Sequence, residues 1–83
     1  MSFDSTYYAR ALGSDSSIPE LSRVALTAPQ PAEDGRMLPE GSEGTIVGTW
    51  ARGEAYEVEF TQPFAALITV EPLHFRVTTE PRV

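Results

Sequence analysis

The sequence predicts a mainly β fold: a small five-stranded SH3-like barrel with a long loop after the first strand and an N-terminal arm. The strongest support comes from residues 56–60, Tyr-Glu-Val-Glu-Phe, where apolar and acidic side chains alternate with the period of two typical of a half-buried strand. A turn at residues 51–54 separates this segment from residues 46–50, which indicates an antiparallel hairpin. The chain has 83 residues, enough for one small domain with one core.

The turn of this hairpin contains Gly53 near its end. This position favours a type I turn closed by a left-handed residue, because glycine adopts positive φ without the steric penalty of a Cβ. Gly48 is a candidate for a β-bulge, and a bulge there would change the sheet face on which Trp50 lies.

We divide the chain into an arm at residues 1–20, a barrel at residues 21–78 and a tail at residues 79–83. Residues 13–17, Gly-Ser-Asp-Ser-Ser, predict a flexible break, and Pro19 adds a second one. We expect the arm to be either a frayed terminus or an element whose aromatic residues cover a strand edge or reach a second subunit.

The first strand is predicted at residues 21–27, and residues 28–42 form a long loop rich in proline, glycine and acidic residues. The prolines of this loop are expected to exclude a regular ladder or a helix. Met37 and Leu38 in its middle could pack back onto the barrel. Loops of about fifteen residues inside a small domain are often functional or mobile.

Residues 64–70, Phe-Ala-Ala-Leu-Ile-Thr-Val, predict a strand that is buried on both faces or covered on its outer face by another element. Pro72 fits the first position of a helical turn at residues 71–73, and residues 75–77 form the last strand. Closing the five strands into a barrel would remove exposed strand edges. A partly opened five-stranded barrel of another type is the alternative topology.

The formal net charge is −6, from twelve acidic residues against six arginines, and the chain contains no lysine and no cysteine. This charge disfavours nucleic acid and anionic membrane surfaces as partners. The lack of cysteine excludes disulfides, thiolate zinc sites and thiol catalysis. The first residues, Met-Ser-Phe-Asp-Ser, do not resemble a signal peptide, and no run approaches the ~18 apolar residues of a membrane span, so we expect a cytoplasmic protein.

Several segments together resemble one protein family. They are residues 38–41 (Leu-Pro-Glu-Gly), 44–47 (Gly-Thr-Ile-Val), 55–60 (Ala-Tyr-Glu-Val-Glu-Phe) and 66–72 (Ala-Leu-Ile-Thr-Val-Glu-Pro). The combination resembles the bacterial domain of unknown function DUF4926 and extends over residues 21–77. The resemblance implies an SH3-like barrel, similar in outline to the barrel of the nitrile hydratase β subunit. It implies no activity, cofactor or site residue, and mobile gene cassettes are one source of small acidic proteins of this kind.

His74 is the only histidine, so any general-base role would fall on it. No nucleophile motif accompanies it, and we expect a structural or solvent-facing histidine. Glu57 and Glu59 lie on one face of a strand and could bind a divalent cation, although the solvated face of an amphipathic strand normally shows the same pattern. We therefore expect no enzyme activity, metal or cofactor, and keep a weak enzyme or metal site around His74 as an alternative.

The function predicted from the sequence is a small acidic, non-enzymatic module that binds a protein, either a second copy of itself in a homodimer or a larger partner. An antitoxin or immunity-type inhibitor of a basic effector is a further alternative. Trp50 lies beside the hairpin turn, where an aromatic cluster could form a shallow groove for peptides, but it could instead cap the barrel core. The candidate partner-binding residues are Tyr7, Tyr8, Arg36, Trp50, Arg52 and Tyr56.

Overall fold

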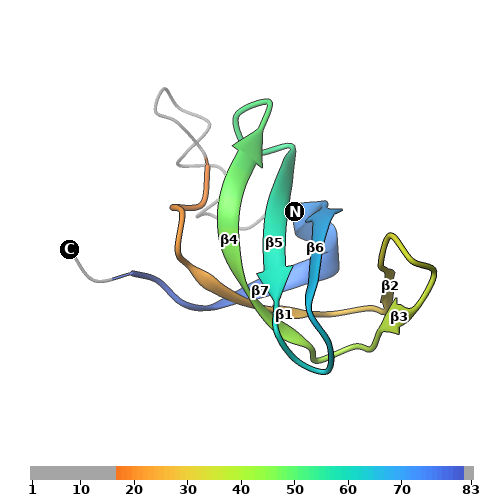
Figure 1. The fold of residues 1–83 in the computed structure, drawn as a ribbon. Helices are drawn as coiled ribbons and strands as arrows, with labels where there is room; N and C mark the ends of the chain where they lie inside the picture. Colours follow the sequence, from red (N-terminus) through yellow and green to blue (C-terminus); the bar gives the residue numbers. More distant parts are fainter. Residues whose placement is uncertain (1–16, 82–83) are drawn as a thin grey trace.

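The computed structural model describes residues 17–81, and strands make up most of their regular structure (Figure 1). In chain order the elements are β1 (Arg23–Leu26), β2 (Gln30–Pro31), β3 (Met37–Leu38), β4 (Glu43–Trp50), β5 (Ala55–Phe60), β6 (Ala66–Val70), the 3-10 turn η1 (Pro72–His74) and β7 (Phe75–Thr79). No α-helix occurs among these residues, so the prediction of a mainly β fold is confirmed. It follows that the described part of the chain has no helix able to span a membrane.

Five strands form one antiparallel sheet in the order β6-β5-β4-β1-β7, and β2 pairs with β3 in a separate two-stranded ladder. Figure 1 shows β4, β5 and β6 side by side, with β1 and β7 crossing below them and the β2–β3 hairpin beyond β6. Strands β6 and β7 are the two edges of the sheet, and no pairing within residues 17–81 joins them. The described strands therefore form an open sheet where a closed barrel was predicted.

The long loop after β1 contains regular structure that the sequence analysis excluded. Gln30 pairs with Leu38 and Pro31 with Met37 in a two-residue ladder. Proline is tolerated here because so short a strand requires few backbone donors. The prediction that this segment packs back on the sheet is confirmed for Leu38, which is fully buried, and is wrong for Met37, which is exposed.

The register of β4 against β5 contains the β-bulge expected near Gly48. Ile46 pairs with Val58, but Gly48 pairs with Glu57, so β4 advances by two residues while β5 advances by one. Val47 is the extra residue, and beyond it the two faces of β4 are exchanged. Trp50 consequently lies on the outer face of the sheet.

The turn between β4 and β5 differs in type from the prediction. Ala51 and Arg52 both have positive φ, at 48° and 60°, and Gly53 follows at 108°. Positive φ at two central residues is the mark of a type I′ turn, whose twist matches the right-handed twist of the paired strands. The expected left-handed glycine is present, but the type I turn before it is wrong.

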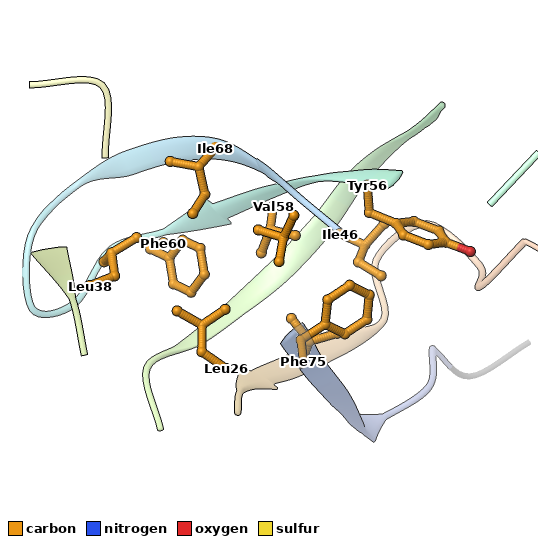
Figure 2. Close-up of a cluster of buried hydrophobic side chains, with 10 residues drawn as sticks. Leu26, Leu38, Ile46, Tyr56, Val58, Phe60, Ile68 and Phe75 are labelled. Atoms are coloured by element: carbon orange, nitrogen blue, oxygen red, sulfur yellow. The ribbon is translucent and has the colours of Figure 1, made fainter. Parts of the chain in front are cut away.

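The inner face of the sheet carries a cluster of buried apolar side chains (Figure 2). The phenol ring of Tyr56 packs edge-on against Phe75, with ring centroids 5.6 Å apart. Its hydroxyl oxygen accepts a 2.8 Å hydrogen bond from the backbone N–H of Ile18, which ties the chain before β1 to the core. The cluster consists of Val24, Leu26, Leu38, Ile46, Tyr56, Val58, Phe60, Ile68, Val70 and Phe75.

Strand β6 is buried on one face alone. Ile68 and Val70 point into the core, whereas Leu67 is 55% exposed. The expectation that its apolar sequence reflects burial on both faces, or a covered outer face, is therefore wrong. The helical turn before the last strand is present as η1, and β7 extends two residues beyond the predicted strand.

Two glycines of β4 provide a matched test of the packing. A Cβ on Gly44 would lie 2.8 Å from the backbone oxygen of Glu59 and 2.7 Å from Val58 Cγ1, whereas a Cβ on Gly48 would meet Glu57 at 3.4 Å. We expect Gly44→Ala to lower the free energy of unfolding by about 1–3 kcal/mol, because the paired strands must separate. Gly48→Ala should leave it unchanged or slightly raised. Urea denaturation measures both, and equal destabilisation of the two variants would contradict the register.

Candidate functional site

The outer face of β4, β5 and β6 brings Trp50, Glu57 and Thr69 together. Glu57 pairs with Gly48 on β4 and with Thr69 on β6, and Trp50 lies one step further along β4, diagonal to Glu57. Diagonal neighbours in an antiparallel pair remain within reach of long aromatic side chains. Because of the bulge at Val47, the three side chains lie on one face.

The carboxylate of Glu57 accepts two hydrogen bonds at the same oxygen. Trp50 Nε1 donates to Oε2 at 2.7 Å, and Thr69 Oγ1 donates to it at 2.7 Å. These donors, Thr69 first and Trp50 second, lower the pKa of the Glu57 carboxyl below its usual value because they stabilise the charged form. The indole therefore has a fixed polar edge while 56% of Trp50 remains exposed.

A groove of about 620 Å³ runs beside this cluster, between the β2–β3 hairpin and the edge of the sheet. One wall is the consecutive segment 65–69 at the start of β6, and the other is the segment 31–34 of the hairpin. Figure 1 shows the hairpin separated from β6 on this side. Glu57 and Thr69 also line the groove, so the Trp50 cluster and the groove form one continuous surface.

The charges lining the groove are all negative. They come from Glu33, Asp34 and Glu57, and the lining includes no basic residue. Arg36 lies close by, but Asp34 binds it: Asp34 Oδ2 accepts from Arg36 Nε at 2.7 Å and lies 2.7 Å from Nη2. The Arg36 side-chain hydrogen bond lowers the pKa of the Asp34 carboxyl, so this acid is charged at neutral pH.

Arg36 also fixes the hairpin to the sheet. Its guanidinium carbon lies 3.8 Å from the centroid of the Phe64 ring, which packs against the core just before β6. A cation over an aromatic face contributes roughly 0.5–1 kcal/mol at an exposed site. The role of Arg36 as a partner contact stays a prediction, and the structure places it on the hairpin beside the groove, in contact with Phe64.

The remaining predicted site residues fall in different places. Tyr56 is 1% exposed and belongs to the core, so its assignment to a binding surface is wrong. Its side chain points to the same buried face of β5 as those of Val58 and Phe60. Its partner across the ladder is Thr49, whereas Trp50 pairs with Ala55. The expectation that Trp50 and Tyr56 face each other is therefore also wrong.

Arg52 is exposed at the hairpin turn, on the same end of the sheet as Trp50. Tyr7 and Tyr8 lie outside the described residues. His74 lies half-buried in η1 and lines neither the groove nor the Trp50 cluster. In the part of the chain that the structure describes, no three His, Asp or Glu side chains stand close enough to hold a metal ion.

Thr69 and Leu67 are surface residues that the sequence pattern did not predict. The sequence placed Thr69 in a strand covered on both faces, and it placed Glu57 on a solvated face or in a cation site with Glu59. The available signal was the polar Thr69 inside an otherwise apolar strand, because a hydroxyl in a doubly buried strand needs a partner. The contact between Thr69 and Glu57 depends on the register of β5 against β6, and local sequence patterns do not determine that register.

The model of a family described as domain of unknown function (DUF4926) matches residues 20–77. This range agrees with the resemblance over residues 21–77 and contains β1 to η1 and the first part of β7. Comparison with the curated proteins and with the solved structures gives no match.

The indole N–H of Trp50 offers a direct test of the cluster, because the chain has one tryptophan. Its NMR resonance should titrate with the protonation of Glu57, with a midpoint below the usual glutamate pKa of about 4.3. Thr69→Val should raise this midpoint, because it removes the strongest donor to the carboxylate. A midpoint at the usual value that Thr69→Val leaves unmoved would contradict the geometry.

The same shift has a consequence for stability. A carboxyl whose pKa is lowered by folding stabilises the fold above its unfolded pKa, and this contribution is lost as the pH falls through the folded pKa. We therefore expect Glu57→Gln to lower the free energy of unfolding at neutral pH and to match wild type more closely at acidic pH, once the pH has fallen through the lowered pKa of Glu57. Urea denaturation at both pH values measures the difference, with Glu80→Gln, beyond the strands, as the control.

Proposed function

The chain belongs to the DUF4926 family, and we propose that it is a cytoplasmic, non-enzymatic module that binds a protein through the outer face of β4, β5 and β6. The observation that carries this proposal is Trp50: a large aromatic side chain, 56% exposed, whose indole N–H is held by Glu57. Tryptophan is one of the residues enriched among the energetic centres of protein interfaces. A side chain fixed before binding loses less conformational entropy when a partner arrives.

The charge of the surface supports a protein partner with basic groups. Residues 17–81 contain ten acidic residues and four arginines, so this part of the chain has a net charge of −6. Glu33, Asp34 and Glu57 line the groove beside Trp50, and of these Asp34 is paired with Arg36. Complementary charge increases the association rate and suppresses partners of the wrong sign. An inhibitor of a basic effector, the alternative from the sequence, would use the same surface.

We infer an SH3-like arrangement for the sheet, opened between β6 and β7. Three features support this interpretation: the loop after β1 that carries the β2–β3 hairpin, the consecutive strands β4, β5 and β6, and the single 3-10 turn before β7. These are the elements expected of an SH3-like barrel from the sequence. In this arrangement the hairpin stands next to the sheet edge and provides one wall of the groove.

The proposal is tested by selecting a random peptide library on phage against the immobilised full chain. Selected peptides are then measured by isothermal titration calorimetry with wild type and Trp50→Ala. We expect Trp50→Ala to weaken binding by about tenfold or more, since an interface centre contributes at least ~1.4 kcal/mol. The matched control is Leu73→Ala, which removes a side chain that is 71% exposed on η1, away from the proposed surface.

Leu73→Ala should bind the same peptides within about twofold of wild type. Unfolding in urea confirms that each variant is folded, which is expected because neither side chain belongs to the buried cluster. The proposal is wrong if selection returns no binding peptide, or if the two alanine variants weaken binding to the same extent.

A further inference from the structure

We propose that the groove beside β6 binds an extended, basic segment of a partner protein, which pairs with the open edge of β6 as an added strand. This inference rests on the proposed function and specifies the chemistry of the partner and its mode of binding. Three observations carry it: an unpaired strand edge without protection, a groove that follows that edge, and the negative charge of the lining.

The first observation is the open edge. Strand β6 pairs with β5 on one side, and no strand among residues 17–81 pairs with the other side. In an antiparallel strand every second residue directs its N–H and C=O to the same side, so β6 presents backbone donors and acceptors outward. Such an edge is a template for a further strand.

The second observation is that β6 lacks three of the devices that often protect an edge, namely a charged side chain, a proline and a bulge. Residues 64–70 contain no charged residue and no proline, and β6 pairs with β5 without a bulge. The opposite edge is different: β7 carries Arg76, and its ladder with β1 has an irregular register at Arg23. Charges and bulges discourage strand addition, so the structure protects β7 and leaves β6 available.

The third observation is the groove. Its sheet wall is a run of consecutive residues, 65–69, that includes the outward-facing Leu67 and the inward-facing Ile68. A pocket on one face of a strand would be lined by alternate residues, because successive side chains point to opposite faces. The groove therefore follows the edge of β6, where an added strand would lie.

The negative charge of the groove lining favours a basic segment as the added strand. Glu33 and Asp34 stand on the hairpin wall and Glu57 on the sheet, and no basic side chain lines the groove. A strand with arginine or lysine at alternate positions would place cations beside these carboxylates while its backbone pairs with β6. Trp50 lies at the end of the same surface and can contact the cationic side chains through its exposed ring.

A second copy of this chain fits the groove poorly. Pairing two β6 edges would bring the carboxylates of both grooves together. Asp34 is paired with Arg36, so the net negative charge of each groove comes from Glu33 and Glu57. The segment 1–16 of the chain carries Asp4 and Asp15 against Arg10, so it is not basic either. Charge complementarity therefore favours a separate basic partner over both.

Arg36 acts as a positioning residue in this arrangement. Its stacking on Phe64 connects the hairpin to the segment just before β6, and its ion pair with Asp34 orders the guanidinium within the hairpin. A wall fixed before binding reduces the entropy cost of forming the complex.

The test uses a synthetic peptide of roughly ten residues that alternates arginine and valine, with blocked ends, and the full-length chain. Calorimetry at about 0.15 M salt gives its affinity. Two further peptides carry N-methyl groups, one at every arginine and one at every valine, which remove the N–H donors from one side of the strand or the other. We expect one of these two peptides to lose about tenfold or more in affinity and the other to lose less.

Two protein variants locate the site. Glu33→Gln should weaken binding of the arginine–valine peptide by about two- to fivefold, whereas Glu80→Gln, which removes the same charge beyond β7, should not. NMR should show that the peptide shifts the backbone amides of β6 and leaves those of β7 unchanged. A peptide that alternates glutamate and valine should not bind.

The outcomes separate this inference from the proposed function. If phage-selected peptides bind and depend on Trp50 while the arginine–valine peptide does not bind, the module binds proteins but the β6 inference is overturned. It is also overturned if both methylated peptides bind like the parent, or if Glu33→Gln and Glu80→Gln weaken binding alike, because binding is then unspecific attraction between charges. If neither kind of peptide binds, both proposals fail.

Discussion

The bulge at Val47 decides which side chains of this protein reach its surface. Before the bulge, Ile46 faces the core opposite Val58; after it, Gly48 faces outward opposite Glu57. Without the extra residue, Trp50 would share the inner face with Ile46, because side chains alternate with a period of two. Because of this one inserted residue, Ile46 stays in the core and the indole of Trp50 lies on the outer face. The cluster of Trp50, Glu57 and Thr69 depends on this change of register.

Glu57 connects the Trp50 cluster with the groove along β6. Its carboxylate binds the indole of Trp50, which comes from β4, and the hydroxyl of Thr69, which comes from β6, so it links three strands across the outer face. The same residue lines the groove along β6. Because both donors favour the charged form, the carboxylate that orients Trp50 also keeps its negative charge at neutral pH. Orientation of the aromatic surface and polarity of the groove thus come from one side chain.

Local patterns predicted the local elements well. The alternation around Val58, the glycine of the turn and the proline that begins η1 each indicated an element that is present. The same alternation placed Tyr56 on the buried face, and the assignment to a binding surface ignored it. The exposed outer face of β6 was not predictable in this way, because an apolar strand has the same sequence pattern whether its second face is covered or exposed. Its open edge depends on strand pairing, which a local pattern does not specify. Thr69, Leu67 and the groove depend on register and on the place of the hairpin, which are long-range properties.

The acidic lining and the unprotected edge of β6 complement each other. An apolar edge without charge or bulge invites pairing with any extended chain, including a second copy of the same protein. Charges within β6 would prevent this, but they would also abolish the edge as a binding site. Here the negative charges stand beside the strand, on the hairpin and on β5, where they repel an identical acidic copy and leave the backbone of β6 accessible. In the proposed mode of binding, the same carboxylates would disfavour pairing with a second copy and favour a basic partner.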